Sequence, residues 1–184
     1  MGPKSDSELI ADFKNGDVAG FNELVRRHQQ SVYWVARRIV GRHEEADDVA
    51  QEVFVKIYEA LKHFRNEARF STWLYRIATN MSLNALRKNR LREFVNFEDA
   101  AGAIADSSDG PIEEMDHQQY EGALKRAIDR LPKKQKAVFV LRYYEELPYE
   151  KMASILKRSV GGLKANYFHA LKKIQKYVLE ELGS

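Results

Sequence analysis

Apolar residues recur every three or four positions along most of this chain, and that spacing constrains its fold more than any other feature. One such run begins at Phe21 and ends near Gly41, and another extends from Tyr120 to Leu131. The spacing is typical of amphipathic helices that bury one face. No segment shows a convincing alternation of apolar and polar residues with the period of a half-buried strand. The sequence therefore predicts an all-α protein.

The helical runs fall into two groups, separated by an acidic stretch. Residues 94–117 contain many Asp and Glu but no Lys or Arg, and they include an Asp-Ser-Ser-Asp-Gly-Pro run at 106–111. This stretch has no sustained apolar period, which favours a linker. We therefore expect two small helical domains, residues 1–93 and 118–182, joined by a flexible acidic linker at 94–117.

Composition excludes several classes of protein. The chain of 184 residues has no Cys, which rules out disulfide scaffolds and Cys-ligated zinc and suits a reducing cytoplasm. No apolar run approaches the length needed to span a bilayer, so we expect no stable membrane insertion. The His residues lack metal-ligand spacing, and no phosphate-binding loop or nucleophile elbow is present. We therefore expect a cytoplasmic protein that is not an enzyme and has no catalytic residues, cofactor or metal.

The segment 148–173 has the pattern of a helix-turn-helix. A short helix after Pro148 is followed by the connection Lys157-Arg158-Ser159, and Ser159 can cap a last, basic helix. Lys164 and Lys173 suit phosphates, and Asn166 could read a base edge. Residues that lie off the apolar stripe of the last helix are Ser159, Gly161, Gly162, Lys164, Ala165, Asn166, His169, Lys172 and Lys173. The alternative, a solvated basic helix face, remains open from this segment alone.

A second basic stretch, residues 62–92, mixes Arg and Lys with aromatic and Asn residues. Bases that leave a duplex need stacking surfaces, polar edges and cationic contacts, and these residue types supply them. Trp73 lies on an apolar stripe and fits a core position better. The best candidates for direct DNA contact are the loop residues Arg65, Asn66, Arg69 and Phe70.

The helix expected near residues 43–61 carries acidic residues away from its apolar stripe. Its polar side includes Glu44, Glu45, Asp47, Asp48, Gln51 and Glu52, with Phe54 nearby. A docking face for a basic partner fits this pattern best. Two alternatives remain open: a solvated face, and a divalent-metal site in a helical hydrolase or transferase, since Asp48 and Glu52 stand one helical turn apart.

Four segments then match one family in order and spacing. They are residues 44–54 (EEADDVAQEVF), 71–80 (STWLYRIATN), 131–147 (LPKKQKAVFVLRYYEEL) and 149–164 (YEKMASILKRSVGGLK). Together they closely resemble the bacterial RNA polymerase sigma factors of the extracytoplasmic-function group. The resemblance covers nearly the whole chain, about 21–95 and 118–180. It implies sigma region 2 in the first domain and sigma region 4, with its helix-turn-helix, in the second.

The resemblance also implies roles for individual residues in promoter-specific transcription initiation. Core docking against the β′ clamp helices falls to Asp47, Asp48, Gln51, Glu52 and Phe54. Recognition and opening of the −10 element falls to Arg65, Asn66, Arg69, Phe70, Arg76, Asn80, Asn84, Arg87 and Lys88. Recognition of the −35 element falls to Ser159, Gly161, Lys164, Asn166, His169, Lys172 and Lys173. Residues 132–147 would face the β flap, and an anti-sigma factor is an expected partner.

Three positions depart from the family pattern. Lys157 stands where the family often has Gly in the helix-turn-helix turn, and a left-handed backbone is costly for Lys. Gly162 and Ala165 replace a Thr and a Ser that could contact DNA. We therefore carry over no promoter sequence. The alternative function is a stand-alone helix-turn-helix regulator that binds operators without polymerase.

Overall fold

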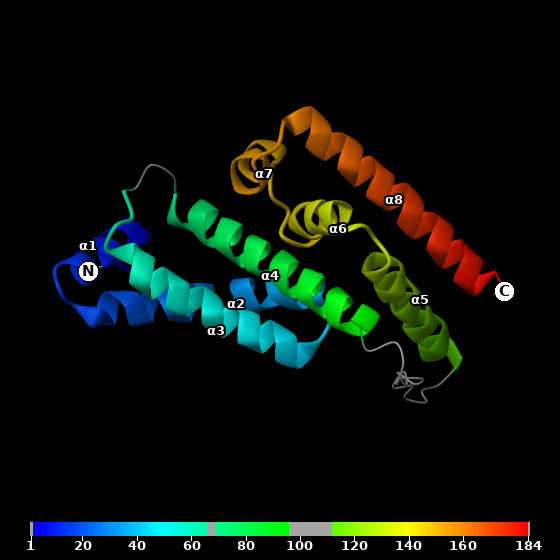
Figure 1. Ribbon diagram of the computed structural model, residues 1–184, viewed down its shortest axis with the longest axis horizontal. Coiled ribbons are helices and arrows are strands. Elements are labelled where there is room, and N and C mark those ends of the chain that lie inside the picture. Colours follow the sequence, from blue (N-terminus) through cyan, green and yellow to red (C-terminus); the bar gives the residue numbers. More distant parts are fainter. Residues whose placement is uncertain (1, 66–68, 96–111, 184) are drawn as a thin grey trace.

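The computed structural model describes residues 2–65, 69–95 and 112–183, and within these ranges helices are joined by short turns and loops, without a strand. The first unit contains α1 (Asp6–Lys14), α2 (Val18–Val40), α3 (His43–Leu61) and α4 (Phe70–Val95). The second contains α5 (Ile112–Asp129), α6 (Lys133–Phe139), the π-helical turn η1 (Val140–Tyr144), α7 (Tyr149–Leu156) and α8 (Val160–Leu182). The predicted all-α fold is confirmed (Figure 1).

Local side-chain signals determine where several helices begin and end. Asp17 caps α2, because its carboxylate accepts a hydrogen bond from the backbone N–H of Ala19 at 2.9 Å. Gly41 ends that helix with φ 92°, a left-handed conformation that glycine adopts without steric cost. α1 begins after Ser5, which forms a capping box with Glu8.

The first unit buries the apolar stripes of its helices in one core. α2 packs against α1, α3 and α4, and α3 also packs against α4. Fully buried side chains from three helices meet there, among them Ile39, Ile57 and Leu74. Burial of each such side chain contributes about 1.5–3 kcal/mol, so the periodic spacing seen in the sequence is what holds this unit together.

The second unit is built around α8, which packs against α5, α6 and α7 (Figure 1). One core lies between α5, α6 and the C-terminal part of α8, and a second lies between η1, α7 and the start of α8. α7, the connection Lys157-Arg158-Ser159 and α8 form the predicted helix-turn-helix. Ser159 caps α8 by accepting a hydrogen bond from the N–H of Gly162 at 3.2 Å.

The predicted linker is shorter in the structure at both ends. α4 continues to Val95, and α5 begins at Ile112. Residues 96–111 lie outside the described ranges.

The two units are in contact. α4 lies between the rest of the first unit and the helices of the second, and it packs against α7 and α6 (Figure 1). Val140 of η1 is fully buried in the core of the first unit, and Tyr75 of α4 packs against the core formed by η1, α7 and α8. The protein therefore does not consist of two bodies joined only through the chain.

Candidate functional site

The outer face of α8 presents basic and small side chains to solvent. Ser159 and Gly161 open this face, and a side chain placed at Gly161 would meet no other atom within 4 Å. Lys164, Ala165, His169 and Lys172 continue it as exposed residues. Spacings of three and four residues place these groups on one side of the helix. This combination allows close approach of the helix backbone to a ligand, with cations on either side.

Two residues of α8 that were predicted to contact DNA are less exposed than the others. The side chain of Asn166 is half-buried, and its amide donates a hydrogen bond to the carbonyl of Gly162 at 2.7 Å. Lys173 is also half-buried. Of the seven residues predicted to recognise the −35 element, five therefore lie on the open face of α8. The amide of Asn166 is instead held against the helix backbone.

Phe168 is a surface residue that our reading of the sequence missed. Its ring is 54% exposed, next to His169, and the ammonium of Lys172 lies 4.7 Å from its centre. A phenyl ring can contact the methyl group of thymine in the major groove. Phe168 is four residues from both Lys164 and Lys172, and this helical spacing already indicates in the sequence that it shares their face.

The turn before α8 keeps the left-handed geometry for which glycine is suited. Lys157 has φ 54° and ψ 51°, so it takes the strained conformation itself. Lys157 therefore bears a conformational cost that a glycine at this position would not.

The loop before α4 is only partly described, because Asn66 lies outside the described residues. Arg65 and Arg69 are exposed beside it. Phe70, predicted to contact DNA, is only 5% exposed and contacts the rings of Phe64 and Trp73. Phe70 thus belongs to the core in this arrangement, and its ring offers no surface to a base. Phe70 is the first residue of α4, and the helical spacing alone did not indicate whether its side chain lies in the core or at the surface.

Farther along α4, the other residues predicted for the −10 element share one face. Asn80, Asn84, Arg87 and Lys88 are exposed, and Arg76 is half-buried. Their spacing of three or four residues makes a continuous polar stripe. The structure therefore brings these five residues together on α4 as a basic and amide-rich surface.

The predicted acidic face is an exposed ridge on α3. Asp48, Gln51 and Glu52 are exposed, and Asp47 is half-buried near His43, with 3.4 Å between its carboxylate and the imidazole. The other imidazole nitrogen of His43 is hydrogen-bonded to the hydroxyl of Tyr33 on α2 at 2.8 Å. The ridge thus carries carboxylates with no strong basic partner next to Asp48 or Glu52 among the ion pairs described.

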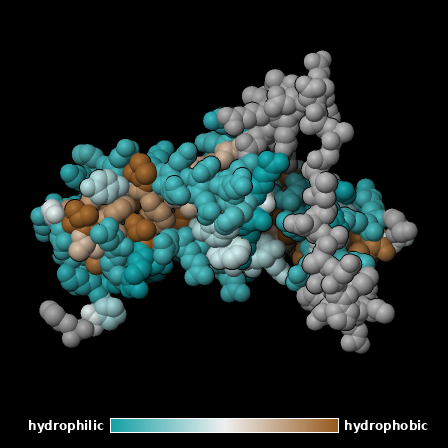
Figure 2. All heavy atoms as spheres, turned by 90° about the horizontal axis from the view of Figure 1, so that it is seen from below, coloured by the Kyte–Doolittle hydropathy of each residue, from teal (hydrophilic) through white to brown (hydrophobic). Residues whose placement is uncertain are grey.

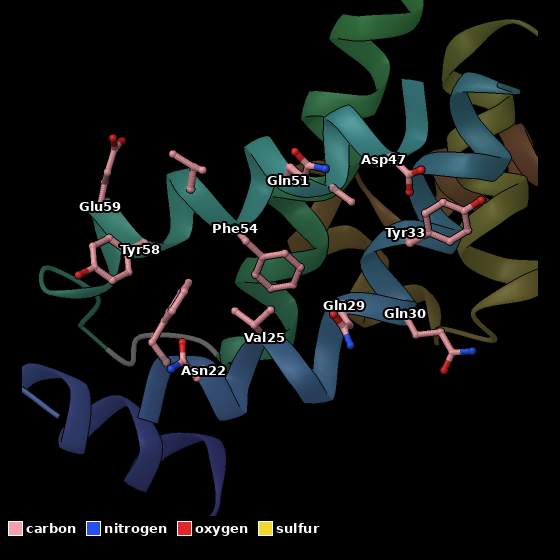
Figure 3. Close-up of a pocket in the computed structure, with 13 residues that line it drawn as sticks. Asn22, Val25, Gln29, Gln30, Tyr33, Asp47, Gln51, Phe54, Tyr58 and Glu59 are labelled. Carbon is pink, nitrogen blue, oxygen red and sulfur yellow. The ribbon is translucent and has the colours of Figure 1, made fainter. Parts of the chain in front are cut away.

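An apolar groove runs between α2 and α3 beside this ridge. Figure 3 shows Phe54 of α3 pointing across the groove towards Val25 of α2, with Asp47 and Tyr33 at one end and Tyr58 at the other. Val55 is 60% exposed and Tyr58 is 44% exposed, although both are large apolar residues. Figure 2 shows apolar surface gathered at this end of the first unit. Neither Val55 nor Tyr58 was predicted, yet their spacing from Gln51 and Phe54 places them on the same face.

The described residues include no group of three or more His, Asp or Glu side chains placed to hold a metal ion. None of the described helices is both long and apolar enough to cross a membrane. The acidic ridge of α3 is therefore organised as a surface beside an apolar groove rather than as a cluster of converging ligands.

The fold and its surfaces are those of an all-helical protein with two units. The first unit carries the acidic ridge of α3 and the basic stripe of α4, and the second carries a helix-turn-helix. Comparison with known families agrees, since residues 24–92 match sigma-70 region 2 and residues 121–174 match sigma-70 region 4. The chain belongs to the extracytoplasmic-function (ECF) sigma factors of RNA polymerase. It is thus a sigma factor that directs RNA polymerase to promoters.

Individual relatives extend over almost the full length. The RNA polymerase sigma-H factor of Pseudomonas aeruginosa is 33% identical over 180 residues, covering 94% of this chain and 93% of that protein. The ECF RNA polymerase sigma-E factor of Haemophilus influenzae is 35% identical over 178 residues, covering 93% and 94%. The solved sigma factor RpoE of Bartonella quintana, in complex with the anti-sigma factor NepR, has a similar fold, with a TM-score of 0.66, 19% identity and coverage of 86% and 96%.

Proposed function

We propose that four surfaces of this sigma factor have separate roles. The ridge Asp47, Asp48, Gln51 and Glu52, with Phe54, docks on the β′ clamp helices of core polymerase. The exposed stripe of α4 with Arg65 and Arg69 contacts the −10 element and assists strand opening. The open face of α8 reads the −35 element. Residues 132–147 face the β flap.

The observation that carries this proposal is the separation of charge between the surfaces. The α3 ridge is acidic and borders an apolar groove, whereas the stripes of α4 and α8 are basic. Nucleic-acid phosphates favour the basic faces and repel the acidic one. An acidic ridge beside exposed Val55 and Tyr58 supports docking to a protein surface that offers both cations and apolar side chains.

On the open face of α8, Phe168 joins the predicted readers in this proposal. Lys164 and Lys172 contact phosphates, and Phe168 and His169 reach base edges. Gly161 and Ala165 allow the helix to lie deep in the major groove, because neither carries a bulky side chain. Lys164→Ala should weaken all promoters about equally and lower the slope of binding against salt by about one.

We further propose that the protein works in the cytoplasm, without catalytic activity of its own, and that an anti-sigma factor controls it. The similar fold of a sigma factor solved with an anti-sigma factor supports such a partner. The stand-alone regulator is the alternative function, but it leaves the acidic ridge of α3 unused.

The test is run-off transcription with purified core polymerase on a set of genomic promoters. Discrete transcripts that need both this chain and core are expected. A folded protein that binds free duplex operators with nanomolar affinity, and adds no transcript to core, would instead establish the regulator.

A further inference from the structure

α1 is connected to both ends of the loop that precedes α4. The ammonium of Lys14, in the last turn of α1, donates a hydrogen bond to the backbone carbonyl of Phe64. At the other end of α1, the carboxylate of Asp6 lies 2.9 Å from Nε2 of His28 on α2. The ring centre of His28 in turn lies 5.4 Å from that of Phe70. α1 thus reaches one end of the loop directly and the other through His28.

Both ends of this loop are anchored in a cluster of buried aromatic rings. The side chains of Phe64 and Phe70 are buried, and their ring centres lie 6.1 Å apart. Trp73 completes the cluster, with its ring centre 4.8 Å from that of Phe64 and 6.0 Å from that of Phe70. Arg65 directly follows the first phenylalanine and Arg69 directly precedes the second, and both arginines are exposed. The way in which the two phenylalanines are held therefore sets where the two arginines start.

The hydrogen bond from Lys14 acts on the peptide unit that joins Phe64 to Arg65. A peptide unit is planar, so a fixed carbonyl also fixes the direction in which the backbone of Arg65 begins. α3 ends at Leu61, so this carbonyl lies beyond the last turn of that helix. The donor carries a charge, which makes the bond stronger than one between two neutral groups. Lys14 is therefore placed to select one backbone arrangement at Arg65, although the two bonded residues are 50 positions apart.

α1 itself is held firmly by its own packing. Leu9, Ile10 and Phe13 are buried, and the helix packs against α2. The ring centre of Phe13 lies 5.2 Å from that of Tyr58 on α3, and Figure 1 shows α1 beside the end of α3. Because Lys14 directly follows Phe13, its backbone is fixed by the same contacts. A side chain on a rigid helix can hold a loop in one arrangement, as a support for a binding site requires.

We propose that α1 is a brace for this loop and that Lys14 is the positioning residue that directs Arg65 towards the −10 element. This role of Lys14 rests on the proposed function, which assigns Arg65 to that element. α1 lies outside the stretch that matches sigma-70 region 2, which begins at residue 24. Lys14 does not touch DNA. It reduces the number of backbone arrangements that Arg65 loses on binding, and so favours capture of the opened strand.

The contact is first tested in the free protein by nuclear magnetic resonance. With phenylalanine labelled by ¹³C at the carbonyl, the resonance of Phe64 should shift in Lys14→Met, because its hydrogen bond is lost. The matched control is Lys4→Met, which removes a lysine whose ammonium lies 2.8 Å from the carboxylate of Asp12 on α1. Lys4→Met should leave the Phe64 resonance in place. An unchanged Phe64 resonance in Lys14→Met would overturn the brace.

Strand opening by holoenzyme tests whether Lys14 acts through Arg65. Each variant is assembled with core polymerase, and opening is followed by the fluorescence of 2-aminopurine in the −10 element of a duplex promoter that the wild type transcribes. Lys14→Met and Arg65→Ala should each slow opening about tenfold. Lys14→Met combined with Arg65→Ala should be no slower than Arg65→Ala alone, because the positioned side chain is then absent. Lys14→Arg keeps a charged donor and should open the promoter at nearly the wild-type rate, as should Lys4→Met.

The results separate the brace from the proposed function. If Lys14→Met slows the Arg65→Ala protein by the same factor as the wild type, Lys14 acts through the fold at large and the brace is refuted. Normal opening by Lys14→Met beside a slow Arg65→Ala would also refute it, and would leave the proposed function intact. Normal opening by Arg65→Ala would instead remove that arginine from the proposed −10 contacts, and the brace with it.

Discussion

The side-chain amide of Asn166 donates its hydrogen bond to the carbonyl of Gly162, one turn earlier on the same helix, at 2.7 Å. Asn166 would have to break this bond to present its amide to a base, whereas Phe168 is exposed without any such rearrangement. We therefore expect Phe168 and Asn166 to contribute differently to −35 recognition.

Phe168→Ala should alter base preference more than Asn166→Ala does. Loss of a contact with a thymine methyl group removes discrimination of about 1–3 kcal/mol at that position. Transcription by reconstituted holoenzyme on a library of upstream-element variants would measure both changes. A large shift of preference in Asn166→Ala with none in Phe168→Ala would restore Asn166 as the reader.

Lys157→Gly should stabilise the protein by about 1 kcal/mol. The left-handed conformation at Lys157 is costly for a side chain with a Cβ and free for glycine. Thermal or urea unfolding monitored by circular dichroism measures the difference. Arg158→Gly is the control, since Arg158 has no left-handed backbone to relieve and should lose stability through the greater freedom of its unfolded chain.

Phe70→Ala and Arg69→Ala should fail in different ways. Phe70 is buried among Phe64 and Trp73, so its truncation should destabilise the first unit by about 3–5 kcal/mol. Arg69 is exposed, so Arg69→Ala should fold normally and transcribe poorly from duplex promoters, with a smaller defect on pre-melted templates. Equal defects of Arg69→Ala on both templates would argue against a role in strand opening.

Much of the fold could be predicted from the sequence because its signals are local. A cap such as Asp17 bonds to a backbone N–H two residues away, and the apolar stripes follow from helix geometry alone. The ion pair between Arg38 and Glu145 could not be predicted, since the two residues are 107 positions apart and no periodicity relates them. Phe70 was expected at the surface for a related reason: whether the first residue of a helix points into a core depends on Phe64, which lies in the loop before α4, as well as on Trp73 within the helix.

Tyr75 should make stability fall at alkaline pH. Burial, and then the charge of Glu145, raise the pKa of Tyr75 to about 12, above the value of about 10 for an unfolded chain. The protonated phenol is therefore favoured in the folded state. Its contribution is full below about pH 10 and is lost as pH rises towards 12, because the unfolded state then releases the proton first.

This pH dependence can be measured as the fall in melting temperature between about pH 10 and pH 12. Tyr75→Phe should show a smaller fall than the wild type, and Tyr120→Phe, at an exposed tyrosine of α5, serves as the control. Parallel curves for the wild type and Tyr75→Phe would show that Tyr75 ionises alike in both states.

The most direct test of the account is run-off transcription with Asp48→Lys. Asp48 is exposed on the α3 ridge, so charge reversal should leave the circular dichroism and the melting temperature nearly unchanged. It should sharply weaken assembly with core polymerase, because like charges then meet at the interface. We predict loss of promoter-specific transcripts with retained DNA contacts. Normal holoenzyme formation and transcription by the folded Asp48→Lys protein would contradict the account.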